Sequence, residues 1–108
     1  MTFGVATKRG VWFFEGAGME KRKGIFNGNE MAAMITITYD YDAKLFYSGT
    51  ANGYIYAWAG NSCTKTQKVH EGAVMGLAYA SGKLLSSGSK DNLIKISKDG
   101  QLLKEIKI

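Results

Sequence analysis

Three residues in the later part of the sequence have the types that carry out acyl transfer. His70, Ser87 and Asp91 could supply a general base, a nucleophile and an orienting carboxylate. In one large class of hydrolases the serine stands in a Gly-x-Ser-x-Gly turn. Ser87 lacks that surrounding and falls on an expected strand, whereas Asp91 falls in an expected turn. We therefore predict a structural role for the three residues, as partners in a buried hydrogen-bond network, and expect no catalysis.

The densest basic cluster is the run Lys21-Arg22-Lys23, with Lys8 and Arg9 in an earlier turn. One interpretation is an exposed edge strand, because lysines keep such strands from pairing with other chains. The other is a contact surface for an acidic partner. A run of three charges is short, and exposed ion pairs contribute only about 0–1 kcal/mol each. Both interpretations stay open.

Aromatic residues and the charge balance raise the question of nucleic-acid binding. Trp12, Phe13, Phe14 and Trp58 could stack on bases, and the formal charge is +5. Aromatic side chains at strand spacing more often form a core, where each buried one contributes roughly 1.5–3 kcal/mol. We favour the core interpretation and expect nucleic acid to be an unlikely partner. A modest positive charge also serves solubility.

Composition limits the remaining chemistry. The sequence has one Cys and one His, so it can form neither an internal disulfide nor a zinc site of its own. We expect Cys63 to be an ordinary buried residue, and we expect no cofactor and no metal. No apolar run approaches the roughly 18 residues of a membrane span, and the first ten residues lack a signal-peptide pattern. These features suggest an intracellular protein without a membrane partner.

The best-defined element is a hairpin that ends in Tyr54-Ile55-Tyr56-Ala57-Trp58. Its turn is Ala51-Asn52-Gly53, in which Asn and Gly both tolerate positive φ. The hairpin returns about forty residues later, since 44–49 resembles 83–88 and the same offset places Asn52 beside Asp91. A repeat of this length made of short strands is typical of a propeller blade.

The whole chain divides into about eleven short strands without a convincing helix. Alternation and turn residues group them into three, four and four strands, so the fold class is all-β. A four-stranded antiparallel meander is one blade, and the first group lacks its innermost strand. The predicted units are 1–28, 31–69 and 70–108.

Motifs in the third unit resemble those of WD-repeat β-propellers. The segment 69–74 is similar to the loop and inner strand that carry the buried His of that family, and 86–91 to its second strand and Asp turn. The third strand, 93–97, also matches, except that Ser97 stands where the family has Trp. The second unit has Trp58 but Asn52 in place of Asp, and the first has Phe14 at the Trp position. The resemblance implies that His70, Ser87, Asp91 and Trp58 belong to structural networks within blades.

Within that superfamily the chain resembles the echinoderm microtubule-associated protein-like proteins. The similarity lies in the basic segment 21–28, where Asn27 departs from the pattern, in the hairpin 47–58, and in the spacing from Trp58 to His70. It implies a non-catalytic scaffold in the cytoplasm and cytoskeleton, with the ciliary axoneme as one such place. Tubulin or ciliary neighbours are then the expected partners. The candidate contacts to an acidic tubulin surface are Lys8, Arg9, Lys21, Arg22 and Lys23.

Three blades cannot close a ring, because propellers have about four to eight. We expect further blades from a longer chain, or less favourably from another polypeptide, since open ends would expose apolar faces. Two other functions remain open, namely an adaptor of an unrelated complex and a small nucleic-acid-binding β domain. An enzyme is the weakest of the candidate classes.

Overall fold

A computed structural model describes residues 2–7, 10–15, 20–26, 33–98 and 101–107. These residues form three antiparallel sheets and contain no helix. The first sheet consists of β1 (Thr2–Thr7), β2 (Gly10–Glu15) and β3 (Glu20–Lys23). The second consists of β4 (Met34–Asp40), β5 (Leu45–Thr50), β6 (Tyr54–Ala59) and β7 (Ser62–Lys68). The third consists of β8 (Val74–Ala80), β9 (Lys83–Gly88), β10 (Leu93–Lys98) and β11 (Gln101–Lys107).

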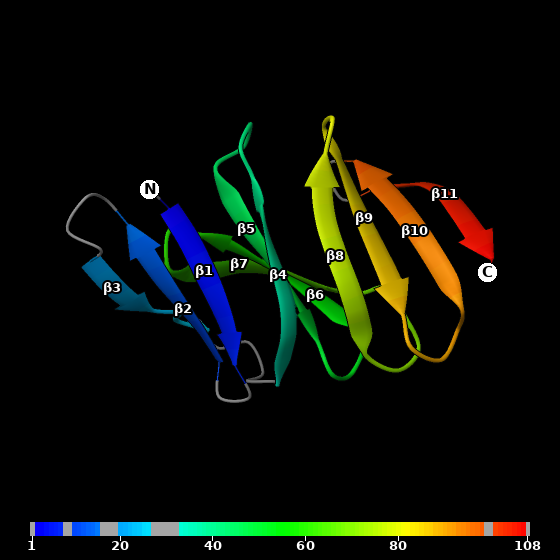
Figure 1. Cartoon of the computed structure of the whole chain (residues 1–108), viewed down its shortest axis with the longest axis horizontal. Coiled ribbons are helices and arrows are strands. Elements are labelled where there is room, and N and C mark those ends of the chain that lie inside the picture. Colours follow the sequence, from blue (N-terminus) through cyan, green and yellow to red (C-terminus); the bar gives the residue numbers. More distant parts are fainter. Residues whose placement is uncertain (1, 8–9, 16–19, 27–32, 99–100, 108) are drawn as a thin grey trace.

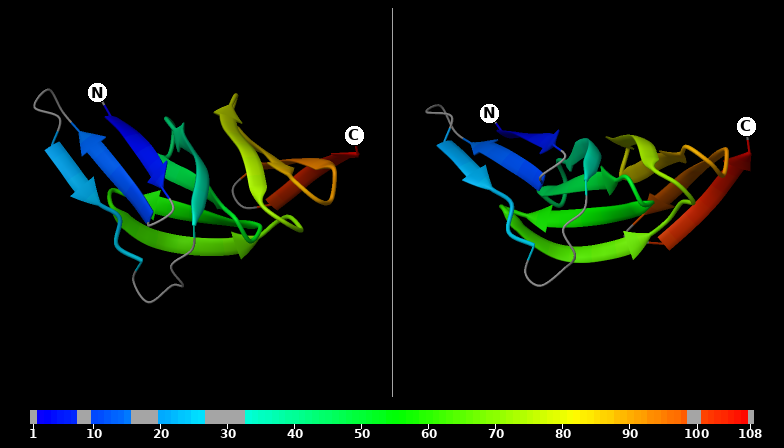
Figure 2. Two further views of the ribbon diagram at one scale, coloured as in Figure 1. Left: turned by 60° about the horizontal axis from the view of Figure 1, so that its bottom comes forward. Right: turned by 90° about the horizontal axis from the view of Figure 1, so that it is seen from below.

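The three sheets lie side by side, in the order in which they follow along the chain (Figure 1). Strand β4 contacts β1 on one side and β8 on the other, while β7 and β11 lie at the far edges of their sheets. Two further views show that the sheets are strongly twisted and follow one another along an open arc (Figure 2). The all-β prediction, with meandering four-stranded units and an incomplete ring, is confirmed.

The turns follow from residues that accept unusual backbone angles. Gly53 closes the β5–β6 hairpin at a φ of 90°, and Ser81-Gly82 closes the β8–β9 hairpin at 51° and 74°. Positive φ at both central positions is the requirement of a two-residue turn between twisted strands. Between β4 and β5, the side chain of Asp40 accepts hydrogen bonds from the backbone of Asp42 and Ala43, each at 2.9 Å.

The largest hydrophobic core lies between the first and second sheets. Phe13 and Trp58 are fully buried, with ring centroids 5.5 Å apart, and Phe46 lies 4.9 Å from Phe13. A Cβ on Gly24 would approach Trp58 to 2.7 Å, so the backbone of the first sheet lies directly against the indole. The core interpretation of Phe13 and Trp58 is therefore confirmed, and Cys63 is a buried member of the same cluster.

Trp12 does not share this core. Consecutive strand residues face opposite sides of a sheet, so Trp12 and Phe14 lie on the face that points away from the second sheet, where both are half-buried. Trp12 and Phe14 thus lie outside this cluster, and the Trp12 ring lies beneath two lysines of β3, so the core interpretation is not confirmed for these two residues.

Candidate functional site

The residue types that suggested acyl transfer do meet in the third sheet. His70 lies in the loop before β8, with Nδ1 2.8 Å from Asp91 Oδ2 and Nε2 2.9 Å from Ser86 Oγ. Asp91 also accepts hydrogen bonds from the backbone of Glu71 at 3.2 Å and Leu93 at 3.1 Å. The network therefore ties the loop before β8 to strand β9 and to the turn that enters β10.

The charge state of Asp91 fixes the proton on the imidazole. Burial raises the pKa of Asp91, but hydrogen bonds from His70, Leu93 and Glu71 outweigh that effect, so its pKa lies below the ordinary value. An ionised Asp91 only accepts hydrogen bonds, so Nδ1 of His70 donates to it. In the neutral imidazole, Nε2 is then the acceptor for the Ser86 hydroxyl. The ring is almost entirely buried, at 2% exposure, which supports a structural rather than a catalytic role.

A glycine that sequence reasoning missed completes the site. A Cβ on Gly88 would lie 2.3 Å from Asp91 Oδ1 and 2.7 Å from His70 Nδ1. Any larger residue would separate the two groups that the network joins. The signal in the sequence was the Gly that precedes the Asp-bearing turn, but the repeat pattern does not mark this Gly as part of the network.

The serine partner of His70 is Ser86, and the prediction of Ser87 is corrected. Ser86 pairs with Leu77 and Lys95, as Ser48 in the second sheet pairs with Ile37 and Tyr56. Ser86 is thus the structural counterpart of Ser48, although the constant sequence offset placed Ser87 there.

The cause of this error is a turn of different length. Residues 89–92 separate β9 from β10, whereas residues 51–53 separate β5 from β6, so the third sheet has one extra turn residue. A shift of one residue moves a side chain to the opposite face of its strand. Ser87 accordingly points to the other face, where a Cβ on Gly76 would lie 2.7 Å from its hydroxyl.

Trp58 belongs to a different network. Its Nε1 donates to Ser48 Oγ at 2.8 Å, and Ser48 in turn donates to the Met34 sulfur at 3.3 Å. The grouping of Trp58 with His70 and Asp91 is therefore correct only in the sense that the second and third sheets each have a buried network. In the turn of the second sheet, Thr50 donates to Asn52 and accepts from the Tyr54 backbone at 2.9 Å.

The basic cluster is divided by strand alternation. Lys21 lies 4.7 Å and Lys23 5.8 Å from the centre of the Trp12 ring, because both share a face with that tryptophan. Arg22 pairs with Phe13, so its side chain belongs to the other face. All three are exposed. Lys8 and Arg9 lie outside the described residues, and the predicted role of the five in binding an acidic partner stays a prediction.

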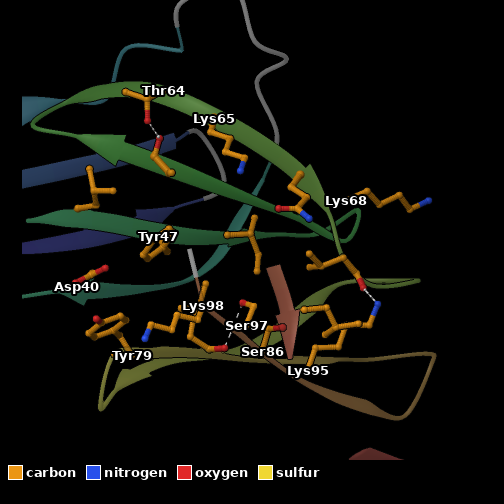
Figure 3. Close-up of a pocket in the computed structure, with 18 residues that line it drawn as sticks. Asp40, Tyr47, Thr64, Lys65, Lys68, Tyr79, Ser86, Lys95, Ser97 and Lys98 are labelled. Carbon is orange, nitrogen blue, oxygen red and sulfur yellow. Dashed lines mark hydrogen bonds between the residues drawn. The ribbon is translucent and has the colours of Figure 1, made fainter. Parts of the chain in front are cut away.

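A pocket of about 290 Å³, here called the inter-sheet pocket, lies between the second and third sheets (Figure 3). Its walls come from β4 through β7 on one side and from β8 through β11 on the other. Tyr79 lies at one end of it and donates to Asp42 at 3.0 Å. Burial, followed by hydrogen bonds to Asp42 and Asp40, raises the pKa of Tyr79, so its hydroxyl stays protonated.

Two other kinds of site, a metal centre and a membrane-spanning helix, have no candidate in the described part of the chain. It contains no group of three or more His, Cys, Asp or Glu side chains arranged to hold a metal ion. None of its described segments is a helix of the length and apolar character that a membrane span requires.

Comparison with curated proteins gives relatives by sequence, one of which is described as ciliary. The chain is 35% identical over 101 residues to the ciliary WD repeat-containing protein ctxp80 of Euplotoides octocarinatus. The match covers 91% of this chain but spans only 14% of the length of that relative. No family model matches the chain.

Solved structures with the same fold cover the chain almost completely. The WD40 β-propeller domain of Doa1 superimposes with a TM-score of 0.80 over 99% of this chain, at 19% identity. A chain of the mitotic checkpoint complex gives a TM-score of 0.75 over 97%, and U3-55K gives 0.76 over 98%, at 19% and 18% identity. The chain matches 37%, 33% and 36% of these structures respectively. Its fold is that of consecutive blades of a WD40 β-propeller.

Proposed function

We propose that the chain is part of a non-catalytic WD-repeat scaffold that binds tubulin or other proteins of the cilium. The observation that carries the proposal is the arrangement of three blade-like sheets in an arc whose polar network residues are buried. His70 and Ser86 are held by one another and by the blade, so the groups that could react are used in folding. The exposed side chains of the sheets are then the groups available to bind a partner protein.

The open ends of the arc support a larger assembly. Leu103 and Ile106 on β11 are 54% and 40% exposed, and Val5 on β1 is 41% exposed. Apolar side chains that gather on one surface mark places where further protein packs. We propose that additional blades, from a longer chain or from another polypeptide, complete the ring. The blade units 1–28, 31–69 and 70–108 stay part of this proposal.

Two sequence similarities favour a role in cilia and on microtubules. One is the identity to a protein described as ciliary, and the other is the resemblance of the hairpin 47–58 and the basic segment 21–28 to the echinoderm microtubule-associated protein-like proteins. Lys21 and Lys23 are exposed on the same face as Trp12 and could bind an acidic surface. We propose a location in the cytoplasm and cytoskeleton, including the axoneme.

Co-sedimentation of the complete protein with microtubules tests this function. The expected result is pelleting that weakens as salt is raised, because exposed charge attraction is screened, and that weakens further in a Lys21→Glu/Lys23→Glu variant. Failure to pellet at low ionic strength, together with absence from cilia of the tagged protein, would exclude the microtubule role.

A second candidate is an adaptor for a complex unrelated to the cilium. It is favoured by the range of the similar folds, which include a chain of the mitotic checkpoint complex and U3-55K. Affinity purification of the complete protein separates the two candidates, since the first predicts tubulin or ciliary proteins as the dominant partners. Binding to nucleic acid stays unlikely, and a gel shift without a complex at physiological salt would exclude it.

A further inference from the structure

The two junctions between neighbouring sheets are filled differently. At the first junction, Tyr56 and Trp58 of β6 pack against the first sheet and are buried. The structural counterparts of these two residues in β10 are Lys95 and Ser97, because Lys95 pairs with Ser86 as Tyr56 pairs with Ser48. Both replacements remove an aromatic ring from the second junction. The inter-sheet pocket occupies that position, and Lys95 and Ser97 line it.

The floor of the inter-sheet pocket is apolar. It is formed by Leu45, Ile55 and Ala57 of the second sheet and by Leu84 and Leu102 of the third. Its volume of about 290 Å³ lies at the lower end of the range for ligand sites. That space accommodates one large side chain with its neighbours rather than a folded element.

The rim is positively charged. Lys65, Lys68, Lys95 and Lys98 line the pocket, and Asp40 is the one acidic residue among the described residues that line it. The carboxylate of Asp40 is occupied by backbone N–H groups of its own turn. Glu71 and Glu105 pair with two of these lysines, so the attraction for negative charge comes from Lys65 and Lys98.

Two of the four lysines are already engaged. Lys95 donates to the carbonyl oxygen of Val69 and lies 3.7 Å from Glu105, and Lys68 lies 3.7 Å from Glu71. Within the described part of the chain, no carboxylate lies within ion-pair distance of Lys65 or Lys98. In Figure 3, Lys65 projects from β7 toward the third sheet, and Lys98 lies beside Tyr79 at the opposite wall.

We propose that the inter-sheet pocket binds a short acidic peptide segment of a partner protein. An apolar side chain of the peptide inserts into the space that Trp58 fills at the other junction, and flanking carboxylates bind Lys65 and Lys98. Both walls come from consecutive sheets, so additional blades would pack outside the pocket. The inference is independent of the ciliary aspect of the proposed function, because any partner with such a segment would bind.

Fluorescence anisotropy on the complete protein tests the proposal, with fluorescein-labelled Glu-Glu-Leu-Glu-Glu as the probe. We expect Ser97→Trp, which refills the pocket, to weaken binding by roughly tenfold or more, as loss of one buried apolar side chain would. Lys65→Glu/Lys98→Glu should weaken it at least as much. The matched control Lys90→Glu/Lys104→Glu makes the same change of charge at two exposed lysines that do not line the pocket. It should leave the affinity within about twofold, which corresponds to about 0.4 kcal/mol.

Several outcomes would overturn the proposal. Unchanged affinity in Ser97→Trp would show that the peptide does not enter the pocket, and Ser97→Leu offers a smaller replacement should the indole disturb folding. Equal binding of Glu-Glu-Ser-Glu-Glu, or of a short RNA, would show unspecific charge attraction. Absence of any binding by the wild-type protein would also overturn it, whatever the result of microtubule pelleting.

Discussion

The carbonyl oxygen of Gly53 accepts a hydrogen bond from the backbone of His70 at 3.1 Å, and it also accepts one from Val69 at 2.9 Å. The turn of the second sheet is thereby docked on the loop that carries the buried histidine of the third. Backbone hydrogen bonds therefore join the tight turn of the second sheet to the polar network of the third sheet.

The first prediction concerns Gly53 itself. Its φ is 90°, and a Cβ there would lie 2.0 Å from the carbonyl oxygen of His70. We expect Gly53→Ala to lower the free energy of unfolding by roughly 2–4 kcal/mol, since it combines backbone strain with a backbone clash. Gly60→Ala is the matched control, because Gly60 also has positive φ but has open space around its Cβ. Gly60→Ala should lower the free energy of unfolding by about 1 kcal/mol. If denaturant titrations gave equal losses for the two variants, the docking role of Gly53 would be contradicted.

The second prediction separates the two adjacent serines of β9. Ser86→Ala removes the partner of His70 Nε2 in a buried site, so we expect a loss of about 1–3 kcal/mol in the free energy of unfolding. Ser87→Ala should change it by only about 0.5 kcal/mol, since Ser87 faces the other side of the strand. Chemical denaturation of both variants measures the difference. A larger effect at Ser87 would mean that the register of β9 is displaced by one residue.

The third prediction concerns the contribution of Asp91 to stability at low pH. The pKa of Asp91 in the folded state lies below the ordinary value of about 3.9. A depressed carboxyl pKa contributes stability that is fully present above the ordinary value and is lost as the pH falls through the folded pKa. Wild-type protein should therefore lose stability more steeply than Asp91→Asn below about pH 4. Parallel slopes in thermal melts between pH 5 and pH 2 would show that Asp91 contributes nothing to this dependence.

The sequence was sufficient for what depends on local pattern. Alternation in 34–39 and the Asn-Gly turn at 52–53 each determine an element through neighbouring residues alone, and all eleven strands are found. The choice between Ser86 and Ser87 depends on a turn that is one residue longer, which an offset between repeats cannot detect. Likewise the run Lys21-Arg22-Lys23 looked like one patch, but the strand sends Arg22 to the opposite face.

The inter-sheet pocket was beyond sequence reasoning for a related reason. The replacement of Trp by Ser97 was visible in the motif, but its consequence depends on what the second sheet places opposite. That wall is lined by Tyr47, Ala57 and Lys65, which leave the space unfilled. A cavity arises from two surfaces that are distant in sequence, so neither strand reveals it alone.

The fourth prediction concerns filling the inter-sheet pocket with a larger side chain. In the second sheet, the Trp58 indole donates to Ser48, and Ser86 is the counterpart of Ser48. In Ser97→Trp the new indole can fill the inter-sheet pocket and donate to Ser86, which already donates to His70. We expect an increase of roughly 1–2 kcal/mol in the free energy of unfolding, the usual gain from filling a cavity. Ser97→Ala, which removes the hydroxyl without filling the space, should give no gain in the free energy of unfolding.

A destabilised Ser97→Trp protein would mean that the walls of the pocket cannot accept an indole in the orientation of Trp58. The peptide side chain that we propose there would then have to be smaller. Because the same substitution is expected to stabilise the fold while weakening peptide binding, the two measurements together distinguish an occupied pocket from a misfolded one.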